Sequence, residues 1–123
     1  MHRIGIDIAS VDRLEAAIRR HPQMLARLFS AQELEDAGSG PQRMARLAAR
    51  FAAKEAFIKA AQGLHGGCWR DIEVRRLPHQ APSLVLYGPV AAWLTSHALT
   101  AELSLSHEKA YAAAVVLIAG GCV

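Results

Sequence analysis

The strongest constraint on the fold is a helical pattern that runs from Gln42 to Gln62. Apolar side chains recur along it at helical spacing, with alanines between them, as they do on the buried stripe of a helix. These apolar positions are Met44, Leu47, Phe51 and Ile58. Gly63 follows directly and is the kind of residue at which helices end. The pattern therefore predicts one long helix of about 20 residues in the middle of the chain.

Shorter helices and strands are predicted before and after the long helix. Residues 3–8 alternate in the manner of a strand, with isoleucines on one face and Gly5 and Asp7 on the other. The other predicted elements are a helix from Ser10 to about Leu28 that breaks near Pro22, a short helix from Ser30 to Gly38, two strands over 72–77 and 83–87, a helix from Pro89 to about His97, and two strands over 101–106 and 110–118. The last strand is apolar enough to be buried on both faces.

Length and composition predict one globular domain over residues 1–123. The chain is 52% hydrophobic and 20% charged, which favours a packed core over disorder. Its formal charge of +3 attracts anions but does not distinguish nucleic acid, membrane surface, nucleotide or acidic protein. We find no secretion signal and no apolar run of about 18 residues, so we expect a cytoplasmic protein. Cys68 and Cys122 have no metal-ligand spacing, and we expect both to be free thiols.

Four basic residues recur at intervals of three and four on the long helix: Arg43, Arg46, Arg50 and Lys54. This spacing places them along one face as a basic stripe. Such a stripe is suited to binding phosphates, although the same pattern is common on the solvated face of a helix. A nucleic-acid-binding helix is a further alternative, but the chain lacks the aromatic pairs of an RNA-binding sheet.

Two carboxylates, Asp7 and Glu55, are the candidate metal ligands. Oxygen ligands of this kind hold Mg2+ when phosphates and water complete its coordination shell. Glu55 neighbours the apolar stripe, so we expect it to be partly buried. A strand Asp and a helix Glu also form ion pairs or structural networks, and the residues alone leave that alternative open. His107, between two predicted strands, is either a phosphate donor or proton carrier, or a loop histidine with a local hydrogen bond.

Three segments spread over the chain form a specific set. They are Ile4-Gly5-Ile6-Asp7-Ile8 followed by Arg13, then Arg50-Phe51-Ala52-Ala53-Lys54-Glu55-Ala56-Phe57 followed by Lys59-Ala60, and finally Leu103-Ser104-Leu105-Ser106-His107 followed by Tyr111-Ala112. Together they resemble the phosphopantetheinyl transferases, and specifically the short bacterial acyl-carrier-protein synthase type. The second segment is the most specific of the three.

The resemblance implies an α+β fold, the 4'-phosphopantetheinyl transferase fold, in which a small antiparallel sheet packs with one long helix and several shorter ones. It implies a homotrimer with coenzyme A in clefts between neighbouring subunits. It also implies Mg2+-dependent transfer of 4'-phosphopantetheine from coenzyme A to a serine of apo acyl carrier protein, with adenosine 3',5'-bisphosphate as the other product. The reaction would serve fatty acid or polyketide biosynthesis, and we expect no nucleic-acid or membrane partner.

The resemblance further implies roles for individual residues. Asp7 and Glu55 match the metal ligands, and Lys59 matches the lysine that contacts the phosphates. The expected catalytic residues are Asp7, Glu55, Lys59 and His107, with Glu55 as the base and His107 as its competitor. The residues expected to bind coenzyme A are Arg43, Arg46, Arg50, Lys54, Lys59, Gly63, Ser106 and His107, with Arg50 and either Arg43 or Arg46 at the 3'-phosphate. Because Asp7, Glu55 and Lys59 are intact, a degenerate transferase that only binds coenzyme A is the weaker alternative.

A docking surface for the acidic carrier protein is expected on the first helix. Arg13, Arg20, Met24 and Arg27 fall on roughly one helical face and resemble the surface that the family presents to its partner. An ordinary solvated face is the alternative. The chain departs from the family at Gln80-Ala81-Pro82, where many members have Gly-Lys-Pro or Gly-Arg-Pro.

Overall fold

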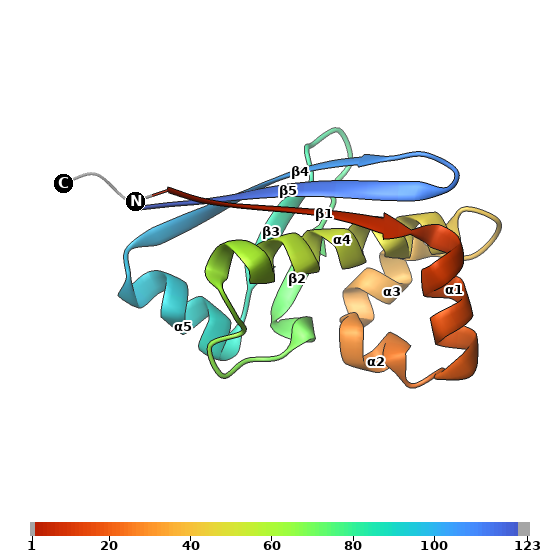
Figure 1. The fold of residues 1–123 in the computed structure, drawn as a ribbon, viewed down its shortest axis with the longest axis horizontal. Helices are drawn as coiled ribbons and strands as arrows, with labels where there is room; N and C mark the ends of the chain where they lie inside the picture. Colours follow the sequence, from red (N-terminus) through yellow and green to blue (C-terminus); the bar gives the residue numbers. More distant parts are fainter. Residues whose placement is uncertain (1, 121–123) are drawn as a thin grey trace.

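The computed structural model describes residues 2–120, and its main sheet contains three antiparallel strands (Figure 1). The strands are β1 (His2–Ser10), β4 (Leu99–His107) and β5 (Tyr111–Gly120), and they lie in the order β1-β5-β4. The long helix α4 (Arg43–Ala61) crosses one face of this sheet and contacts all three strands. A separate antiparallel pair, β2 (Ile72–Arg75) and β3 (Ser83–Leu86), also contacts α4 through β2.

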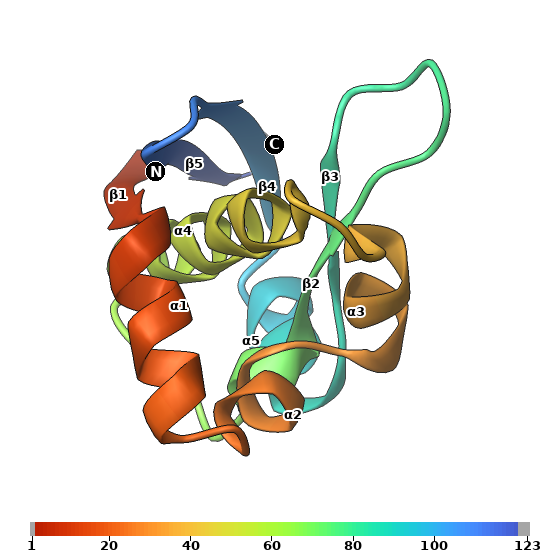
Figure 2. The ribbon, with the colours of Figure 1, turned by 90° about the vertical axis from the view of Figure 1, so that its right-hand side faces the viewer.

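Shorter helices complete the fold around α4 (Figure 2). They are α1 (Val11–Arg20), α2 (Met24–Leu28), α3 (Ala31–Ala37), the 3-10 helix η1 (Trp69–Asp71) and α5 (Gly88–Ser96). The α+β class is confirmed, and each helix and strand predicted within residues 2–120 is present, with ends shifted by a few residues. None of the helices in this range is both long and apolar enough to cross a bilayer.

Local sequence signals explain where the first helices begin and end. The Ser10 side chain accepts a hydrogen bond from the Arg13 backbone N–H at 3.2 Å and caps α1. At α3, Ser30 and Glu33 form the predicted capping box, because each side chain accepts a hydrogen bond from the other's backbone N–H. The break at Pro22 also occurs as predicted and separates α1 from α2.

Small residues allow α4 to lie very close to the main sheet. Gly5 of β1 faces α4, and a Cβ atom built on Gly5 would lie 1.8 Å from the carbonyl oxygen of Ala56. Ala114 on β5 and Ala52, Ala53 and Ala56 on α4 are fully buried in the same contact. The alanines within the predicted apolar stripe therefore determine how closely helix and sheet approach, while larger side chains such as Phe57 fill the core.

The outer face of the main sheet is apolar and exposed. Ile4, Ile6 and Ile8 point away from α4 and are 70%, 58% and 67% exposed, while Gly5 and Asp7 face the helix. The prediction that the 110–118 strand is buried on both faces is wrong for the single chain, since Tyr111 and Val115 are exposed. The reason is that α4 covers only one face, and within residues 2–120 no element covers the other. One chain thus presents a large apolar sheet surface.

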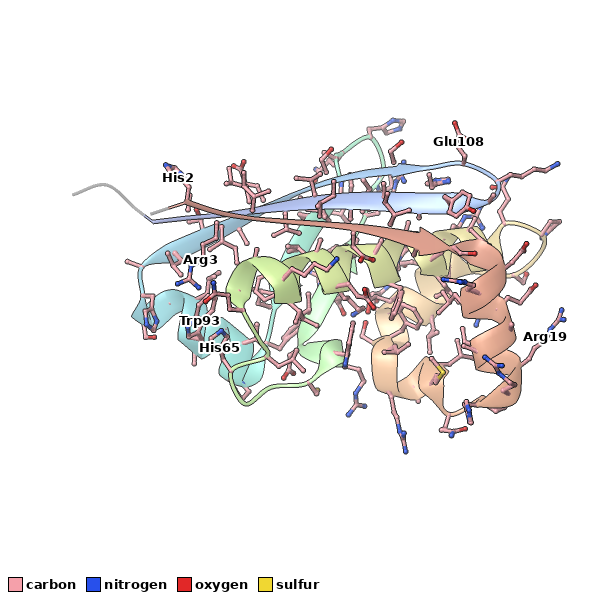
Figure 3. The ribbon with its side chains drawn as sticks, viewed as in Figure 1. His2, Arg3, Arg19, His65, Trp93 and Glu108 are labelled. Atoms are coloured by element: carbon pink, nitrogen blue, oxygen red, sulfur yellow. The ribbon has the colours of Figure 1, made fainter. Side chains whose placement is uncertain are left out.

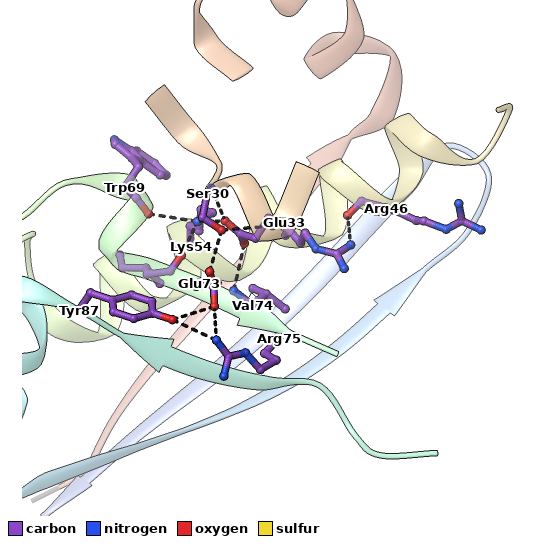
Figure 4. A network of polar contacts seen from close by, with 11 residues as sticks. Ser30, Glu33, Arg46, Lys54, Trp69, Glu73, Val74, Arg75 and Tyr87 are labelled. Atoms are coloured by element: carbon purple, nitrogen blue, oxygen red, sulfur yellow. Dashed lines mark hydrogen bonds and ion pairs between the residues drawn. The ribbon is translucent and has the colours of Figure 1, made fainter. Parts of the chain in front are cut away.

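A buried polar network joins α3, α4 and the β2–β3 pair (Figure 4). The Lys54 Nζ atom lies 2.7 Å from Glu33 Oε1, and both side chains are fully buried. Lys54 also donates hydrogen bonds to the carbonyl oxygens of Trp69 and Ile72. Burial lowers the pKa of Lys54, and the Glu33 carboxylate opposes this shift.

The predicted position of Lys54 on the exposed basic stripe is therefore wrong. Its side chain points into the protein because α4 is covered by α3 and β2 at that level, and every donor direction is directed at Glu33 or a backbone carbonyl. Lys54 holds the helix and the hairpin together and is inaccessible to coenzyme A in this structure.

Beyond α4, the chain is held by an aromatic contact with α5. The His65 ring stacks on Trp93 with ring centroids 4.0 Å apart (Figure 3). His65 Nε2 also lies 2.7 Å from the Ala61 carbonyl oxygen at the end of the helix. His65 therefore fixes the loop after α4 in two places, at the last residue of α4 and at Trp93 of α5. Cys68 in the same connection is a free, exposed thiol, while Cys122 lies outside the described residues.

Candidate active site

Asp7 on β1 meets Lys59 on α4 because Gly5 permits the close approach of the two elements. Lys59 Nζ lies 3.0 Å from Asp7 Oδ1 and donates a second hydrogen bond to the Ile6 carbonyl oxygen at 3.0 Å. Asp7 is buried, whereas the Lys59 side chain is 57% exposed. The pair therefore has one fixed carboxylate and one cation that reaches solvent.

Glu55 adds a second carboxylate to this pair. Burial raises the pKa of Glu55 from its ordinary value of 4.5 to about 6, and the neighbouring Asp7 contributes to the increase through a hydrogen bond and its charge. Lys59 lowers the pKa of Glu55 but does not cancel the effect. When Glu55 is ionised, two neighbouring carboxylates face a single ammonium group, which pairs directly with Asp7, and the remaining negative charge attracts a further cation.

This donor set fits Mg2+. Within residues 2–120, no group of three or more His, Cys, Asp and Glu side chains converges on one point, so the protein offers two carboxylates here and not a complete cage. Mg2+ sites that act on phosphates usually have one or two carboxylates, with water and phosphate oxygens as the remaining ligands. Asp7 and Glu55 are therefore the residues that would hold the ion.

A shallow hollow of about 310 Å³ extends from Asp7 and Glu55 toward α1 and α2. Its lining includes Phe51 and two of the four predicted docking residues, Arg13 and Met24. These two residues therefore border the site formed by Asp7 and Glu55, which we call the carboxylate site. Figure 2 shows that α1 and α2 are separate helices, so the expected single helical face over 13–27 is wrong. Arg20 and Arg27 are exposed but lie outside this hollow.

A second hollow, which we call the arginine hollow, lies between α4, the β2–β3 pair and the end of β4. The hollow has two adjoining parts, which we call the upper part and the lower part. Both parts are lined by Arg46, Arg50, Arg76 and His107. The upper part also reaches Ser106 and Pro82, and the lower part reaches Asp36 and Gln42. The lower part measures about 450 Å³, within the range of roughly 300–1,000 Å³ usual for small-ligand sites.

Arg50 is the buried base of the arginine hollow. Its side chain is 6% exposed, Nη1 donates to the Arg46 carbonyl oxygen at 3.2 Å, and Nε has no hydrogen-bond partner among the described residues. Burial lowers the pKa of Arg50, Glu33 and Asp36 raise it, and the nearby Arg76 and Arg46 lower it further. A buried guanidinium with an unsatisfied donor and two cationic neighbours favours an anionic ligand.

The carboxylate site and the arginine hollow lie on different sides of α4. Arg50 and Glu55 are five positions apart, which corresponds to about 140° around a helix. Asp7 lies on β1 and His107 on β4, the two edges of the main sheet, with β5 between them. The sequence-predicted residues thus form two groups within one chain, not one continuous site.

Two other predicted coenzyme A contacts lie outside both groups. Arg43 Nη1 donates to the carbonyl oxygens of Leu34 and Gly38, at 3.3 and 2.7 Å, and so ties α3 to α4. Gly63 has a φ of 137° and directs the chain away from the end of α4, but it lines neither hollow. Arg43 and Arg46 are the two alternatives expected beside Arg50 at the 3'-phosphate. The structure places Arg46, and not Arg43, in the hollow with Arg50.

Arg76 is a site residue that the sequence patterns do not predict. It directly follows β2, and adjacent residues of an extended chain point to opposite sides. Arg75 is bound to Glu73 and Tyr87, at 2.9 and 3.0 Å, so Arg76 faces the other way, into the arginine hollow. Strand alternation predicts that Arg75 and Arg76 point to opposite sides of β2. Which of the two enters the hollow depends on the position of Glu73, which binds Arg75.

Comparison with known proteins identifies the relatives of this chain. A sequence model described as the 4'-phosphopantetheinyl transferase superfamily matches residues 3–116. A holo-[acyl-carrier-protein] synthase from Moorella thermoacetica is 44% identical, over 96% of this chain and 94% of that protein. The corresponding Streptomyces coelicolor protein is 42% identical, over 95% and 96% of the two chains.

Solved structures give the same result. The ACPS–CoA complex of Chronobacterium ammoniagenes superposes with a TM-score of 0.85 at 30% identity, covering 99% of both chains. A Bacillus anthracis holo-(acyl-carrier-protein) synthase in complex with CoA (3',5'-ADP) has a TM-score of 0.78 at 30% identity, covering 97% of this chain and 96% of that one. The chain therefore belongs to the 4'-phosphopantetheinyl transferase superfamily and, within it, to the holo-[acyl-carrier-protein] synthases.

Proposed function

We propose that this protein transfers 4'-phosphopantetheine from coenzyme A to a serine of apo acyl carrier protein in an Mg2+-dependent reaction that releases adenosine 3',5'-bisphosphate. The observation that carries the proposal is the grouping of Asp7, Glu55 and Lys59 at one accessible site. Two relatives of known structure are described as complexes with coenzyme A, which supports the same substrate here. The whole chain, 1–123, acts as one domain in this proposal.

Lys59 and the two carboxylates have different roles at the diphosphate of coenzyme A. Mg2+ held by Asp7 and Glu55 would supply Lewis-acid stabilisation of charge on the phosphate oxygens. Lys59 is held by Asp7 with its ammonium group near solvent, so it can donate to a phosphate oxygen while remaining fixed. The positioning of this cation before the reaction is a main contribution that the chain makes to phosphoryl transfer.

Glu55 is the favoured base for the carrier serine. A base works best when its pKa is close to the working pH, and in the metal-free protein burial and the neighbouring Asp7 raise the pKa of Glu55 to about 6. Its hollow also opens toward Arg13 and Met24, where the carrier would approach. His107 lies in the arginine hollow across α4, so it competes for this role only if a neighbouring subunit brings it to Glu55.

A homotrimer would bring the two groups of residues together. Coenzyme A carries phosphates at both ends of its nucleotide, yet the carboxylate site and the arginine hollow face different directions in one chain. A neighbouring subunit that presents its arginine hollow to this chain's Asp7 and Glu55 would complete the site. The exposed face of Ile4, Ile6 and Ile8 supplies an apolar surface for such assembly.

The reaction is tested by the mass of an apo acyl carrier protein incubated with this protein, coenzyme A and Mg2+ in the cytoplasmic pH range. We expect one phosphopantetheine arm to be added, and the addition to stop in EDTA. The fatty-acid carrier and polyketide carrier domains are tried in parallel, because an acidic helix and a serine are common to both. Failure of transfer to every carrier would overturn the proposed function.

A further inference from the structure

The arginine hollow contains one cation that no described interaction explains. Arg46 donates to Ala37 and Gln42, and Arg50 donates to the Arg46 carbonyl oxygen. Arg76 forms no hydrogen bond or ion pair with any residue in the range 2–120, although it lines both parts of the hollow. Its five N–H donors are therefore available to a ligand.

The turn of the β2–β3 hairpin makes Arg76 the main source of charge from that side. Between β2 and β3 the chain reads Arg76-Leu77-Pro78-His79-Gln80-Ala81-Pro82. Beyond Arg76 this connection contains no Lys or Arg, and Arg75 is bound to Glu73 on the other side. Any permanent positive charge that the hairpin contributes to the hollow must therefore come from Arg76.

The charges of the hollow match a dianion. Three guanidinium groups and His107 line its lower part, against a single carboxylate from Asp36. The same part lies beside Gln42 and Arg46 at the amino-terminal end of the 19-residue helix α4, where the helix dipole also favours negative charge. A phosphate monoester carries a charge of about −1.5 to −2 at neutral pH and three acceptor oxygens.

We propose that Arg76 binds the 3'-phosphate of coenzyme A, together with Arg46 and Arg50, and sets the preference of this protein for coenzyme A over 3'-dephospho-coenzyme A. This assignment rests on the proposed function, because it takes coenzyme A as the ligand. Arg50 supplies the buried, fixed donor, and Arg76 approaches from the hairpin to close the opposite side of the phosphate. The 5'-diphosphate end of the nucleotide is left to the carboxylate site.

The first test measures binding without turnover. Calorimetry compares adenosine 3',5'-bisphosphate with adenosine 5'-monophosphate on the wild type, Arg76→Ala and Arg76→Lys. We expect Arg76→Ala to weaken bisphosphate binding by about tenfold, as for the loss of a charge-assisted hydrogen bond, with a much smaller effect on the monophosphate. Arg76→Lys should recover part of the loss. Arg70→Ala is the matched control, since Arg70 is exposed and lines neither hollow.

The second test compares kcat/KM for coenzyme A and 3'-dephospho-coenzyme A. The ratio should fall by about tenfold in Arg76→Ala and stay unchanged in Arg70→Ala. Equal losses for both substrates, or no loss, would overturn the assignment of Arg76 even if transfer is normal. If bisphosphate binding depends on Arg76 but no carrier is modified, the assignment stands and the proposed function is wrong. A wild-type protein that does not bind the bisphosphate would overturn the assignment itself.

Discussion

At the scale of single residues, two lysines five positions apart on α4 have opposite roles. Lys54 is fully buried against Glu33, whereas Lys59 is largely exposed beside Asp7. Lys54→Met should lower the free energy of unfolding by about 3 kcal/mol, because it leaves the Glu33 charge buried without its partner. Lys59→Met should lower it by less than Lys54→Met does, because Lys59 is 57% exposed and solvent screens its pair with Asp7, but it should greatly lower kcat. Urea unfolding measures the stability of both variants, and the carrier assay measures kcat. A Lys54→Met protein with normal stability would refute the structural role of Lys54.

Glu55 gives a second residue-scale prediction, for the metal-free protein. Its pKa is about 6 in the folded chain against an ordinary 4.5, so the folded state binds more protons between these values and stability falls as pH rises through this window. Glu55→Gln should therefore raise the free energy of unfolding at about pH 7.5, by no more than about 1 kcal/mol after allowance for solvent screening. The gain should vanish below about pH 4.5.

Urea unfolding in EDTA, at equal protein concentrations, measures this effect of Glu55→Gln. The same variant should lose Mg2+ binding and carrier modification, since it lacks one of the two metal carboxylates. A variant that is less stable than the wild type at about pH 7.5, or that retains normal turnover with Mg2+, would contradict the role of Glu55 in the site.

At the scale of elements, the contact between β1 and α4 determines the geometry of the carboxylate site. In Gly5→Ala the new Cβ would lie 1.8 Å from the Ala56 carbonyl oxygen, so helix and strand must move apart. We expect a loss of about 3 kcal/mol in the free energy of unfolding, at the upper end of the usual overpacking cost. Catalysis should fall as well, because Asp7 and Lys59 lie on the two elements that separate.

Gly40→Ala is the control for Gly5→Ala. A Cβ at Gly40 meets open space, and its cost of about 1 kcal/mol should come only from the positive φ of 91°. Catalysis should be retained in this variant. Equal effects of the two substitutions on stability and catalysis would show that the close contact of β1 with α4 does not position the site.

At the scale of the whole molecule, the two groups of site residues predict complementation between inactive subunits. Glu55→Gln disables the carboxylate site, and His107→Ala weakens the arginine hollow. If neighbouring subunits share each site, mixed assemblies of the two variants contain some intact sites and should recover part of the activity. The carrier assay after subunit exchange measures the recovery. Adding Ile6→Asp to both variants should abolish it by separating the chains, and no recovery from well-mixed assemblies would argue for sites within one chain.

Much of the fold follows from short-range physics that acts along the chain. Hydrophobic periodicity predicts α4, hydrogen-bonding side chains at Ser10 and Ser30 mark helix starts, and Pro22 breaks the first helix. These features depend on residues within a turn or two of one another, so the sequence is sufficient to place them. The candidate site residues Asp7, Glu55 and Lys59 could also be named from their motifs, and the structure brings them together.

The direction in which each side chain points was decided by tertiary packing. Periodicity placed Ile4, Ile6 and Ile8 on one face of β1, but only the contact of Gly5 with α4 shows that this apolar face is the exposed one. Regular spacing likewise put Lys54 in line with Arg46 and Arg50, yet Glu33 and two backbone carbonyls hold it in the interior. Burial and charge pairing depend on residues distant in sequence, whose positions exist only once the chain is folded. The same reason kept Arg76 out of the predicted site and divided that site between the two sides of α4.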